Sequence, residues 1–249
     1  MINYSVNNKI GLIKLNRPEK RNALHPDLVK VFKEKLEHAE KDEKVSLVII
    51  TGEGKSFCAG ADLSYLNDLR NYSSLENEED SKSLADLFLQ IYNFPKPTIA
   101  AVNGAAIAGG CGLVSVCDLI VADRQQAKFG YSEVKIGFIP AVVSIFLVRK
   151  IGEGRAKHLL LTGEIINAEK AFQIGLVNYL ADDVQQFSTE LADELLKNSD
   201  YSMQFTKKIV NDISTLPVEK AVEYCIGLNA LSRTSKDFIN GLSSFLNKK

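Results

Sequence analysis

Residues 97–121 read PTIAAVNGAAIAGGCGLVSVCDLIV, a stretch in which glycines divide two apolar runs. The first run, 98–102, stops at Asn103-Gly104, and the second resumes through Ala108-Gly109-Gly110. Because glycine permits sharp turns, this pattern predicts a strand, a glycine-rich loop and a helix that opens at Gly109. The first N–H groups of such a helix lack partners and carry the positive end of its dipole. The loop is therefore a candidate site at which backbone N–H groups stabilise a developing negative charge.

Two plainer explanations compete with a ligand site. The segment 104–122 is long and apolar enough to suggest a membrane span, but Asp118 and four glycines interrupt it and no flanking basic pattern follows. The glycines can also serve close packing alone, and a single glycine-rich loop does not decide between packing and binding. We expect a buried strand, loop and helix rather than a span.

Composition excludes several classes of function. The chain has 249 residues, of which 45% are hydrophobic and 24% charged, and its formal net charge is -1. Such a balance gives no electrostatic reason to expect nucleic acid or an anionic membrane as a partner. The four cysteines form no C-x-x-C pair and the three histidines are scattered, so no metal site is expected. The N-terminus has no signal-peptide pattern, and a cytoplasmic location is the default expectation.

A second segment follows the plan of the first. Residues 45–63 contain an apolar strand, a glycine turn, an Ala-Gly pair and a helix start, as residues 98–113 do. Glycines mark the turn at the end of each strand. If the two strands are neighbours, backbone N–H groups near Ala61 and near Gly109 lie at equivalent strand ends. The repeat therefore predicts two donors that face one site.

Strands alternate with helices in the first part of the chain, and helices alone follow. We predict strands at 2–15 (a hairpin that turns at Asn7-Asn8), 45–51, 98–102, 119–122 and 176–180, and helices at 26–41, 142–148, 155–161, 168–173, 184–197, 202–213, 217–231 and 235–247. The polar segment 67–80 is expected to be mobile and to lead into a helix ending near Phe94, and a turn is expected at 128–130. This order indicates an α/β core with a helical appendage.

Several motifs together resemble the enoyl-CoA hydratase/isomerase, or crotonase, superfamily. The strings that carry the resemblance are RPEKRNAL (17–24), SFCAGADL (56–63), KPTIAAVNGAAIAGGCGLVSVCDLIVA (96–122), FGYSEVKIGFIPA (129–141) and GLVNYL (175–180). They cover nearly the whole chain in the family's order and spacing. The resemblance implies an α/β fold, a crotonase-type spiral of repeated ββα units over 1–195, and a C-terminal helical trimerisation region over 196–249. It also implies an acyl-CoA thioester substrate, no separate cofactor because coenzyme A is part of that substrate, and a homotrimer or a dimer of trimers.

The same resemblance assigns roles to individual residues. Reactions of this type pass through a thioester enolate, and two backbone N–H groups, by the motifs those of Ala61 and Gly109, form its oxyanion hole. Glu133 is the implied catalytic carboxylate, and an apolar acyl pocket with residues such as Phe129, Ile136 or Phe138 would raise its pKa. The residues assigned to coenzyme A are Lys20, Arg21, Ala23, Ala59, Ala61, Asp62 and Gly109.

The chain departs from the family pattern at Gly112. Members that hydrate a double bond usually carry two glutamates, and Gly112 stands where the first of them belongs, leaving Glu133 alone. Isomerases of the family work with the single later glutamate, so isomerisation is the main alternative to hydration. A catalytically weak protein that binds CoA thioesters is the third reading. Asp118 is expected to anchor the end of the central helix rather than to act as a catalytic acid.

A closer resemblance favours hydration. The combination of Gly112 with a Pro-Ala-Val run at 140–142 resembles bacterial methylglutaconyl-CoA hydratase-type members. We therefore expect hydration of a 2-enoyl-CoA similar to methylglutaconyl-CoA, in fatty-acid or branched-chain amino-acid catabolism.

Overall fold

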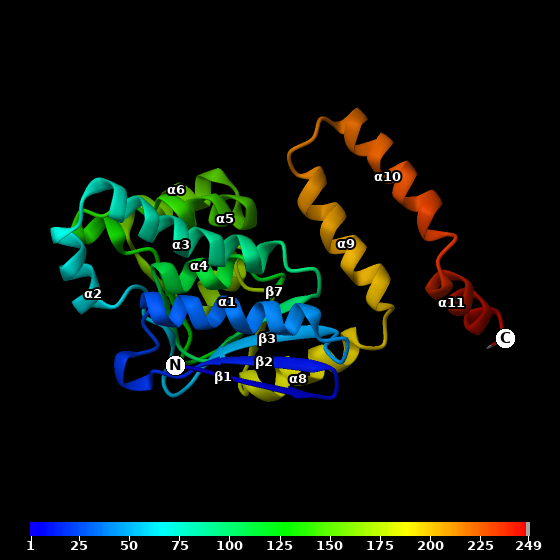
Figure 1. Ribbon diagram of the computed structural model, residues 1–249, viewed down its shortest axis with the longest axis horizontal. Helices are drawn as coiled ribbons and strands as arrows, with labels where there is room; N and C mark the ends of the chain where they lie inside the picture. The colour runs from blue at the N-terminus through cyan, green and yellow to red at the C-terminus, as the bar shows by residue number, and fades with distance from the viewer. Residues whose placement is uncertain (248–249) are drawn as a thin grey trace.

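The computed structural model describes residues 1–247, which form two sheets surrounded by helices (Figure 1). The strands are β1 (Ile2–Asn7), β2 (Ile10–Leu15), β3 (Leu47–Gly52), β4 (Ser56–Cys58), β5 (Thr98–Val102), β6 (Ala105–Ile107), β7 (Leu119–Asp123), β8 (Lys128–Gly130), β9 (Ile165–Asn167) and β10 (Tyr179–Ala181). The α-helices are α1 (Pro26–Lys41), α2 (Leu63–Asp68), α3 (Ser74–Tyr92), α4 (Gly109–Ser115), α5 (Ala141–Ile151), α6 (Glu153–Thr162), α7 (Ala168–Gln173), α8 (Val184–Leu195), α9 (Asp200–Ile213), α10 (Val218–Ser232) and α11 (Lys236–Leu246). Three short 3-10 helices, η1 (Pro18–Lys20), η2 (Leu69–Asn71) and η3 (Glu133–Ile136), complete the elements.

The larger sheet is buried on both faces because its inner strands are largely apolar. All six residues of β3 are buried, and successive side chains of a strand point to opposite faces. Val48 and Ile50 join the main core with residues of α1, α3 and α4, whereas Leu47 and Ile49 join a smaller core with residues of α8. Figure 1 accordingly shows α8 on one side of these strands and α1 on the other.

Both sheets are mostly parallel. The larger sheet has the order β1-β2-β3-β5-β7-β10, in which only β1 runs antiparallel to its neighbour. The smaller sheet has the order β4-β6-β8-β9, in which β8 and β9 are antiparallel. Both sheets are therefore mixed, and consecutive strands alternate between them from β3 to β8.

Two consecutive units of this winding repeat one plan. The units β3-β4-α2 and β5-β6-α4 each send one strand to the larger sheet, one to the smaller sheet, and then form a helix. Ile49 lies opposite Ile99 in the parallel pair β3–β5, and Cys58 lies opposite Ala106 in the parallel pair β4–β6. The segments that follow β4 and β6 therefore leave the smaller sheet side by side, as the repeated sequence plan predicted.

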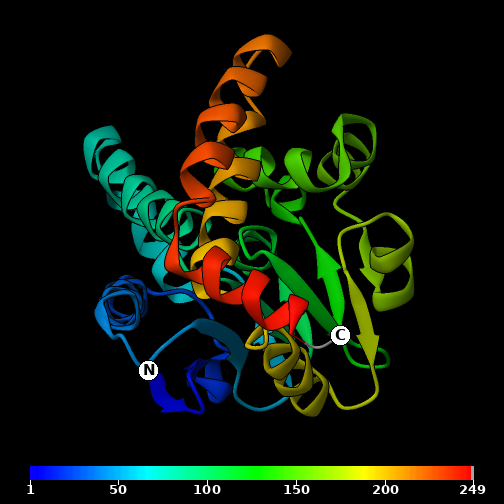
Figure 2. The ribbon, with the colours of Figure 1, turned by 90° about the vertical axis from the view of Figure 1, so that its right-hand side faces the viewer.

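The helices α9, α10 and α11 form an arm beside this body. Figure 1 shows them to one side, and Figure 2, turned so that this side faces the viewer, shows them in front of it. None of the three helices contains a buried residue. Residues 248 and 249 of the predicted C-terminal region lie outside the described residues. Within residues 1–247, no helix is long and apolar enough to cross a membrane.

Most predicted elements are confirmed, and three predictions need correction. The N-terminal hairpin turns at Asn8 and Lys9, both with positive φ, one residue later than predicted. Residues 128–130 form strand β8 rather than a turn, because they pair with β6 and β9, which lie far away in sequence. Residues 67–80, where no helix was predicted, are mostly helical, and α3 begins with a capping box between Ser73 and Glu76. That box is a recognisable helix-start signature, which the sequence prediction overlooked. The mobility expected for this segment stays a prediction.

A largely buried ion pair attaches the arm to the body. Asp118, just after α4, accepts hydrogen bonds from Thr98 N at 2.7 Å and Thr98 Oγ1 at 2.9 Å. The same carboxylate pairs with Lys207 of α9 at 2.7 Å, and the lysine side chain is only 8% exposed. Asp118 thus anchors the end of the central helix, as predicted, and also holds α9.

We expect Lys207→Ala to lower the free energy of unfolding by about 2 kcal/mol, because it leaves a partly buried carboxylate without its cation. The matched control is Lys208→Ala, on the same helix, which removes only the exposed pair with Asp212 and costs less than about 1 kcal/mol. Urea unfolding followed by circular dichroism measures both variants. Equal losses in the two variants would contradict an anchoring role for Lys207.

Candidate active site

A cavity of about 370 Å³ opens where the two repeated units meet helix α3 and the segment from η3 to α5. Three predicted catalytic positions, Ala61, Gly109 and Glu133, line it, and so does Ala59 from the predicted coenzyme A set. These residues come from three separate turns of the winding. The fold therefore brings together positions that the sequence motifs assigned to one site.

Ala61 lies just after β4, in an isolated parallel bridge with Leu24. The bridge is formed by Leu24 N donating to Gly60 O at 2.7 Å and Asp62 N donating to Leu24 O at 2.8 Å. In such a bridge the hydrogen bonds run through the neighbours of Ala61. Within residues 1–247, no acceptor takes the N–H of Ala61 itself, so this donor is available to a ligand in the cavity.

Gly109 is the first residue of α4, where N–H groups have no partner inside the helix. The residue before it, Ala108, has φ 50° and ψ -119°, a backbone conformation that residues other than glycine rarely adopt. Ala108 N donates to Gly130 O at 2.7 Å, which fixes this strained turn to strand β8. The N-terminus of α4 is therefore held in one orientation, with its dipole and its free N–H groups at the cavity.

Glu133 begins η3 and is only 7% exposed. Burial raises the pKa of its carboxyl group, with a smaller opposing effect from a hydrogen bond to its own backbone. Its Oε2 atom has no hydrogen-bond partner among the described residues. Burial also raises the pKa of the Cys111 thiol in the first turn of α4, and the charge of Glu133 adds to that effect. A buried carboxyl with a free oxygen is suited to accept and return a proton.

The apolar surroundings predicted for Glu133 are found in part. Ile136 and Phe138 line the cavity, whereas Phe129 is fully buried in the main core and does not reach it. Tyr131, also fully buried, bonds through its hydroxyl to Ser115 Oγ at 2.7 Å. This bond ties the segment before Glu133 to α4.

Side chains from α3 and α5 fill the space in front of Gly112. A Cβ atom at this position would lie 2.6 Å from Phe88 Cζ and 2.7 Å from Val143 Cγ1. Both of these side chains line the cavity. A larger residue at 112 would therefore displace the cavity wall, and the surroundings of the position where the resemblance implies a first glutamate are apolar in this chain.

The other residues predicted to bind coenzyme A differ in accessibility. Lys20 and Arg21 lie in and just after η1 with exposed side chains, and Ala23 is buried a few residues further on. Ala59 N donates to Arg21 O at 3.0 Å, which holds this loop against the end of β4. The Asp62 carboxylate faces inward and is only 4% exposed. Hydrogen bonds from Ser64 and Arg17 lower the pKa of Asp62 to about 2.

Two residues that the sequence prediction missed hold this loop in place. Arg17 donates from Nη1 to Ala23 O at 2.9 Å and from Nη2 to Asp62 Oδ2 at 3.0 Å. Asn22, fully buried with φ 57°, accepts from Arg17 N and donates to Glu53 O and Ser56 O. Asparagine tolerates this left-handed conformation, but a polar loop sequence does not reveal such distant partners.

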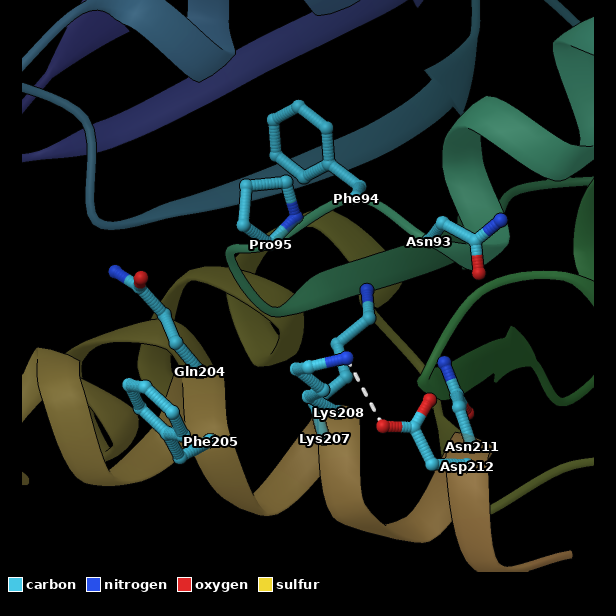
Figure 3. Close-up of a pocket in the computed structure, with 9 residues that line it drawn as sticks. All are labelled: Asn93, Phe94, Pro95, Gln204, Phe205, Lys207, Lys208, Asn211 and Asp212. Carbon is cyan, nitrogen blue, oxygen red and sulfur yellow. Dashed lines mark hydrogen bonds and ion pairs between the residues drawn. The ribbon is translucent and has the colours of Figure 1, made fainter. Parts of the chain in front are cut away.

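A second hollow of about 380 Å³ lies between α9 and the turn before β5 (Figure 3). Its two lysines are already engaged, Lys208 with Asp212 at 2.9 Å and Lys207 with Asp118 at 2.7 Å. Neither Glu133 nor either candidate oxyanion donor lines it. The cavity with Glu133 is therefore the candidate active site. Within residues 1–247, no group of three or more His, Cys, Asp or Glu side chains is arranged to hold a metal ion.

The family model described as Enoyl-CoA hydratase/isomerase matches residues 5–249. The chain belongs to the enoyl-CoA hydratase/isomerase family. The crotonyl-CoA hydratase of Syntrophomonas wolfei is 34% identical to it, over 97% of this chain and 93% of the relative. The 2,3-dehydroadipyl-CoA hydratase of Escherichia coli is 32% identical, over 97% of this chain and 93% of the relative.

Solved structures of family members share the architecture. The crystal structure of an enoyl-CoA hydratase from Shewanella pealeana matches with a TM-score of 0.95 and 30% identity, covering 100% of this chain and 94% of that one. The chain thus has the crotonase fold, with two mixed sheets and C-terminal helices, and the predicted fold class is confirmed.

We expect Gly60→Ala to lower the kcat for an enoyl-CoA by about 100-fold, the cost of losing one oxyanion donor. Gly60 has φ +84°, and an added Cβ would lie 2.8 Å from Ile107 O and 3.1 Å from Ala108 Cβ. The substitution therefore pushes apart the two segments that carry Ala61 and Gly109.

Gly154→Ala is the matched control, because a Cβ at this helical position meets no atom within 4 Å. We expect its kcat to be unchanged and its stability to change by no more than about 1 kcal/mol. Steady-state kinetics and thermal unfolding measure both variants. Full activity in a folded Gly60→Ala variant would refute the proposed spacing of the donors.

Proposed function

We propose that the protein hydrates the double bond of a 2-enoyl-CoA thioester. The observation that carries the proposal is the convergence of two free backbone donors, Ala61 N and Gly109 N, with the buried carboxylate of Glu133 on one cavity. Enolate chemistry needs donors at the thioester oxygen and a proton-transfer group near the adjacent carbons. The names of the hydratases among its relatives support the same reaction.

In the mechanism that we propose, Glu133 acts first as a base and then as an acid. Its carboxylate takes a proton from water while the water oxygen bonds to C3 and the double-bond electrons move toward the thioester. The N–H groups of Ala61 and Gly109 stabilise the enolate oxygen that results. Protonated Glu133 then gives its proton to C2, so that one water has been added and the glutamate is restored.

One observation favours a second candidate, double-bond isomerisation. Phe88 and Val143 occupy the region in front of Gly112, so the site offers no second carboxylate there. A single glutamate is sufficient to take a proton from C2 of a 3-enoyl-CoA and return it to C4. The two reactions differ in product mass, since hydration adds one water and isomerisation adds nothing.

We further propose that Lys20 and Arg21 contact the phosphates of coenzyme A, since both are exposed cations on the loop held beside Ala59. Ala23, Ala59 and the backbone at Asp62 would line the path to the thioester. Methylglutaconyl-CoA is one candidate substrate, suggested by the Gly112 and Pro-Ala-Val motifs.

The experiment that tests the function follows crotonyl-CoA by loss of the enoyl-thioester absorbance and by product mass, in the wild type and in Glu133→Gln. With the wild type we expect the product to be heavier than the substrate by one water. In Glu133→Gln we expect kcat to fall at least about 1,000-fold, because the amide cannot accept a proton. A 3-enoyl-CoA that becomes a 2-enoyl-CoA, without hydration of either, would establish the isomerase instead. Binding of CoA thioesters with no turnover would leave only a binding protein.

The pH dependence of kcat/KM is a second test of Glu133 as the catalytic base. Glu133 must be ionised to act as a base, and burial raises its pKa, so kcat/KM should fall on acidification at a pH above the ordinary glutamate range.

The folded state favours the protonated carboxyl, whose contribution to stability is present below the unfolded pKa and is lost as the pH rises through the folded pKa. Glu133→Gln should therefore be more stable than the wild type at neutral pH and similar to it in acid.

We propose that residues 196–249 form an assembly region, separate from the core at 1–195, and that the protein is a homotrimer or a dimer of trimers. Large apolar side chains on α10 and α11 support this, among them Ile226, 63% exposed, and Phe245, 70% exposed. Exposed apolar groups of this size are typical of interfaces.

Light scattering coupled to size exclusion measures this assembly. We expect a trimeric or hexameric mass for the wild type and a smaller one for Ile226→Glu and Phe245→Glu, because each variant places a charge in the interface. Leu161→Glu, at a 76% exposed position on α6, is the control and should keep the wild-type mass. A monomeric wild type would refute the proposal.

A further inference from the structure

One wall of the active-site cavity is a face of α3 that ends in a carboxylate. Phe88, Leu84 and Asp80 are spaced four residues apart, so they share one helix face, and all three line the cavity. Phe88 is at the inner end, against Gly112. Asp80 lies eight residues from it, about 12 Å along the axis at 1.5 Å per residue. An acyl chain that passes Glu133 and follows this wall meets apolar groups first and a carboxylate afterwards.

Asp80 is held in place by the helix that follows the first oxyanion donor. The Tyr65 hydroxyl of α2 donates to Asp80 Oδ1 at 2.6 Å. The Tyr65 ring packs edge-on against His25 with 5.5 Å between the ring centres, and both residues also line the cavity. Burial, followed by the hydrogen bond to Asp80, raises the pKa of Tyr65, so the hydroxyl keeps its proton and remains the donor in this bond.

The charged side chains that line this cavity are unequally divided between the two signs. Among the residues that the structure describes, the cavity is lined by Asp80 and Glu133 but by no lysine or arginine. His25 is the one basic side chain in the lining, and its Nδ1 atom lies 3.3 Å from Asp27 Oδ2. Lys33 donates to Ser83 Oγ at 3.2 Å without itself lining the cavity. A terminal carboxylate that enters the cavity therefore meets two like charges and no lysine or arginine in the lining with which to pair.

We propose that the cavity selects enoyl groups that end in hydrocarbon, and that the charge of Asp80 is the specificity determinant that rejects a terminal carboxylate. Rejection of this kind works through an unpaired like charge rather than through a new attraction. The inference rests on the proposed function and narrows its substrate class. It disfavours methylglutaconyl-CoA and other dicarboxylic thioesters, although relatives named for charged and for uncharged substrates are about equally similar to this chain.

The test compares two thioesters of equal length, 2-hexenoyl-CoA and 2,3-dehydroadipyl-CoA, which differ in a terminal methyl and a terminal carboxylate. We expect the wild-type kcat/KM to favour 2-hexenoyl-CoA by at least about 100-fold, as unpaired like charges usually discriminate. Asp80→Asn should reduce this ratio about tenfold, because it removes one of the two facing charges. Tyr65→Phe keeps the Asp80 charge and should keep the ratio, so a change in shape is distinguished from a change in charge.

Asp86→Asn is the matched control. Asp86 is on the same helix but outside the cavity lining, and its carboxylate pairs with exposed Lys82. The ratio of kcat/KM for 2-hexenoyl-CoA to kcat/KM for 2,3-dehydroadipyl-CoA should be the same in this variant as in the wild type. A wild type that prefers 2,3-dehydroadipyl-CoA, or an Asp80→Asn ratio equal to that of Asp86→Asn, would overturn the inference.

A binding measurement separates this inference from the proposed reaction. Hexanoyl-CoA and adipyl-CoA are saturated and cannot be hydrated, so calorimetry with the intact protein reports only the affinity. Preference for hexanoyl-CoA supports the selection even if no enoyl-CoA is hydrated, in which case only the hydratase proposal fails. Equal affinities, with 2-hexenoyl-CoA still hydrated, would overturn the selection and leave the hydratase function standing.

Discussion

The close approach of two backbones determines the rest of this site. A Cβ at Gly110 would lie 2.1 Å from Cys58 O, and a Cβ at Gly104 would lie 2.1 Å from Lys55 O. Glycine just before β6 and just after it lets this part of the chain lie directly against β4 and the residue before β4. That contact sets the first turn of α4 beside Ala61, and the two donors follow equivalent strands because β3 pairs with β5, and β4 with β6, in parallel. Side chains elsewhere then decide what the donors can act on.

The fold of the motif-bearing segments could be predicted from the sequence because their determinants are local. Glycines and apolar runs specify the turn and the strand within a few residues, as at Gly109. Strand β8 was missed because its hydrogen bonds depend on partners far along the chain. The same limit hid the Arg17–Asp62 pair. For Gly112, the motif revealed a missing glutamate, but only the structure shows that Phe88 occupies that side of the cavity.

Glu133 illustrates how the candidate site departs from what stability alone would favour. A buried carboxyl with an unpaired oxygen costs folding free energy, since Oε2 of its charged form has lost water without gaining a donor among the described residues. The surrounding bonds, such as Tyr131 to Ser115, hold the segment in place without satisfying that oxygen. Catalytic groups are often kept in such unsatisfied states, because the reactant completes the missing interactions.

The wall formed by α3 has a consequence for how the family can change substrates. The donors are fixed by glycines packed against backbone, so almost any exchange there disturbs the whole centre. Helix α3, in contrast, meets the cavity through side chains at 80, 84 and 88, one turn apart. A single exchange on that face can change the depth of the cavity by about 6 Å, the rise of four residues, while the chemistry stays intact. It can also change the charge of the cavity. New acyl specificities are thus accessible to this scaffold through point mutations on one helix.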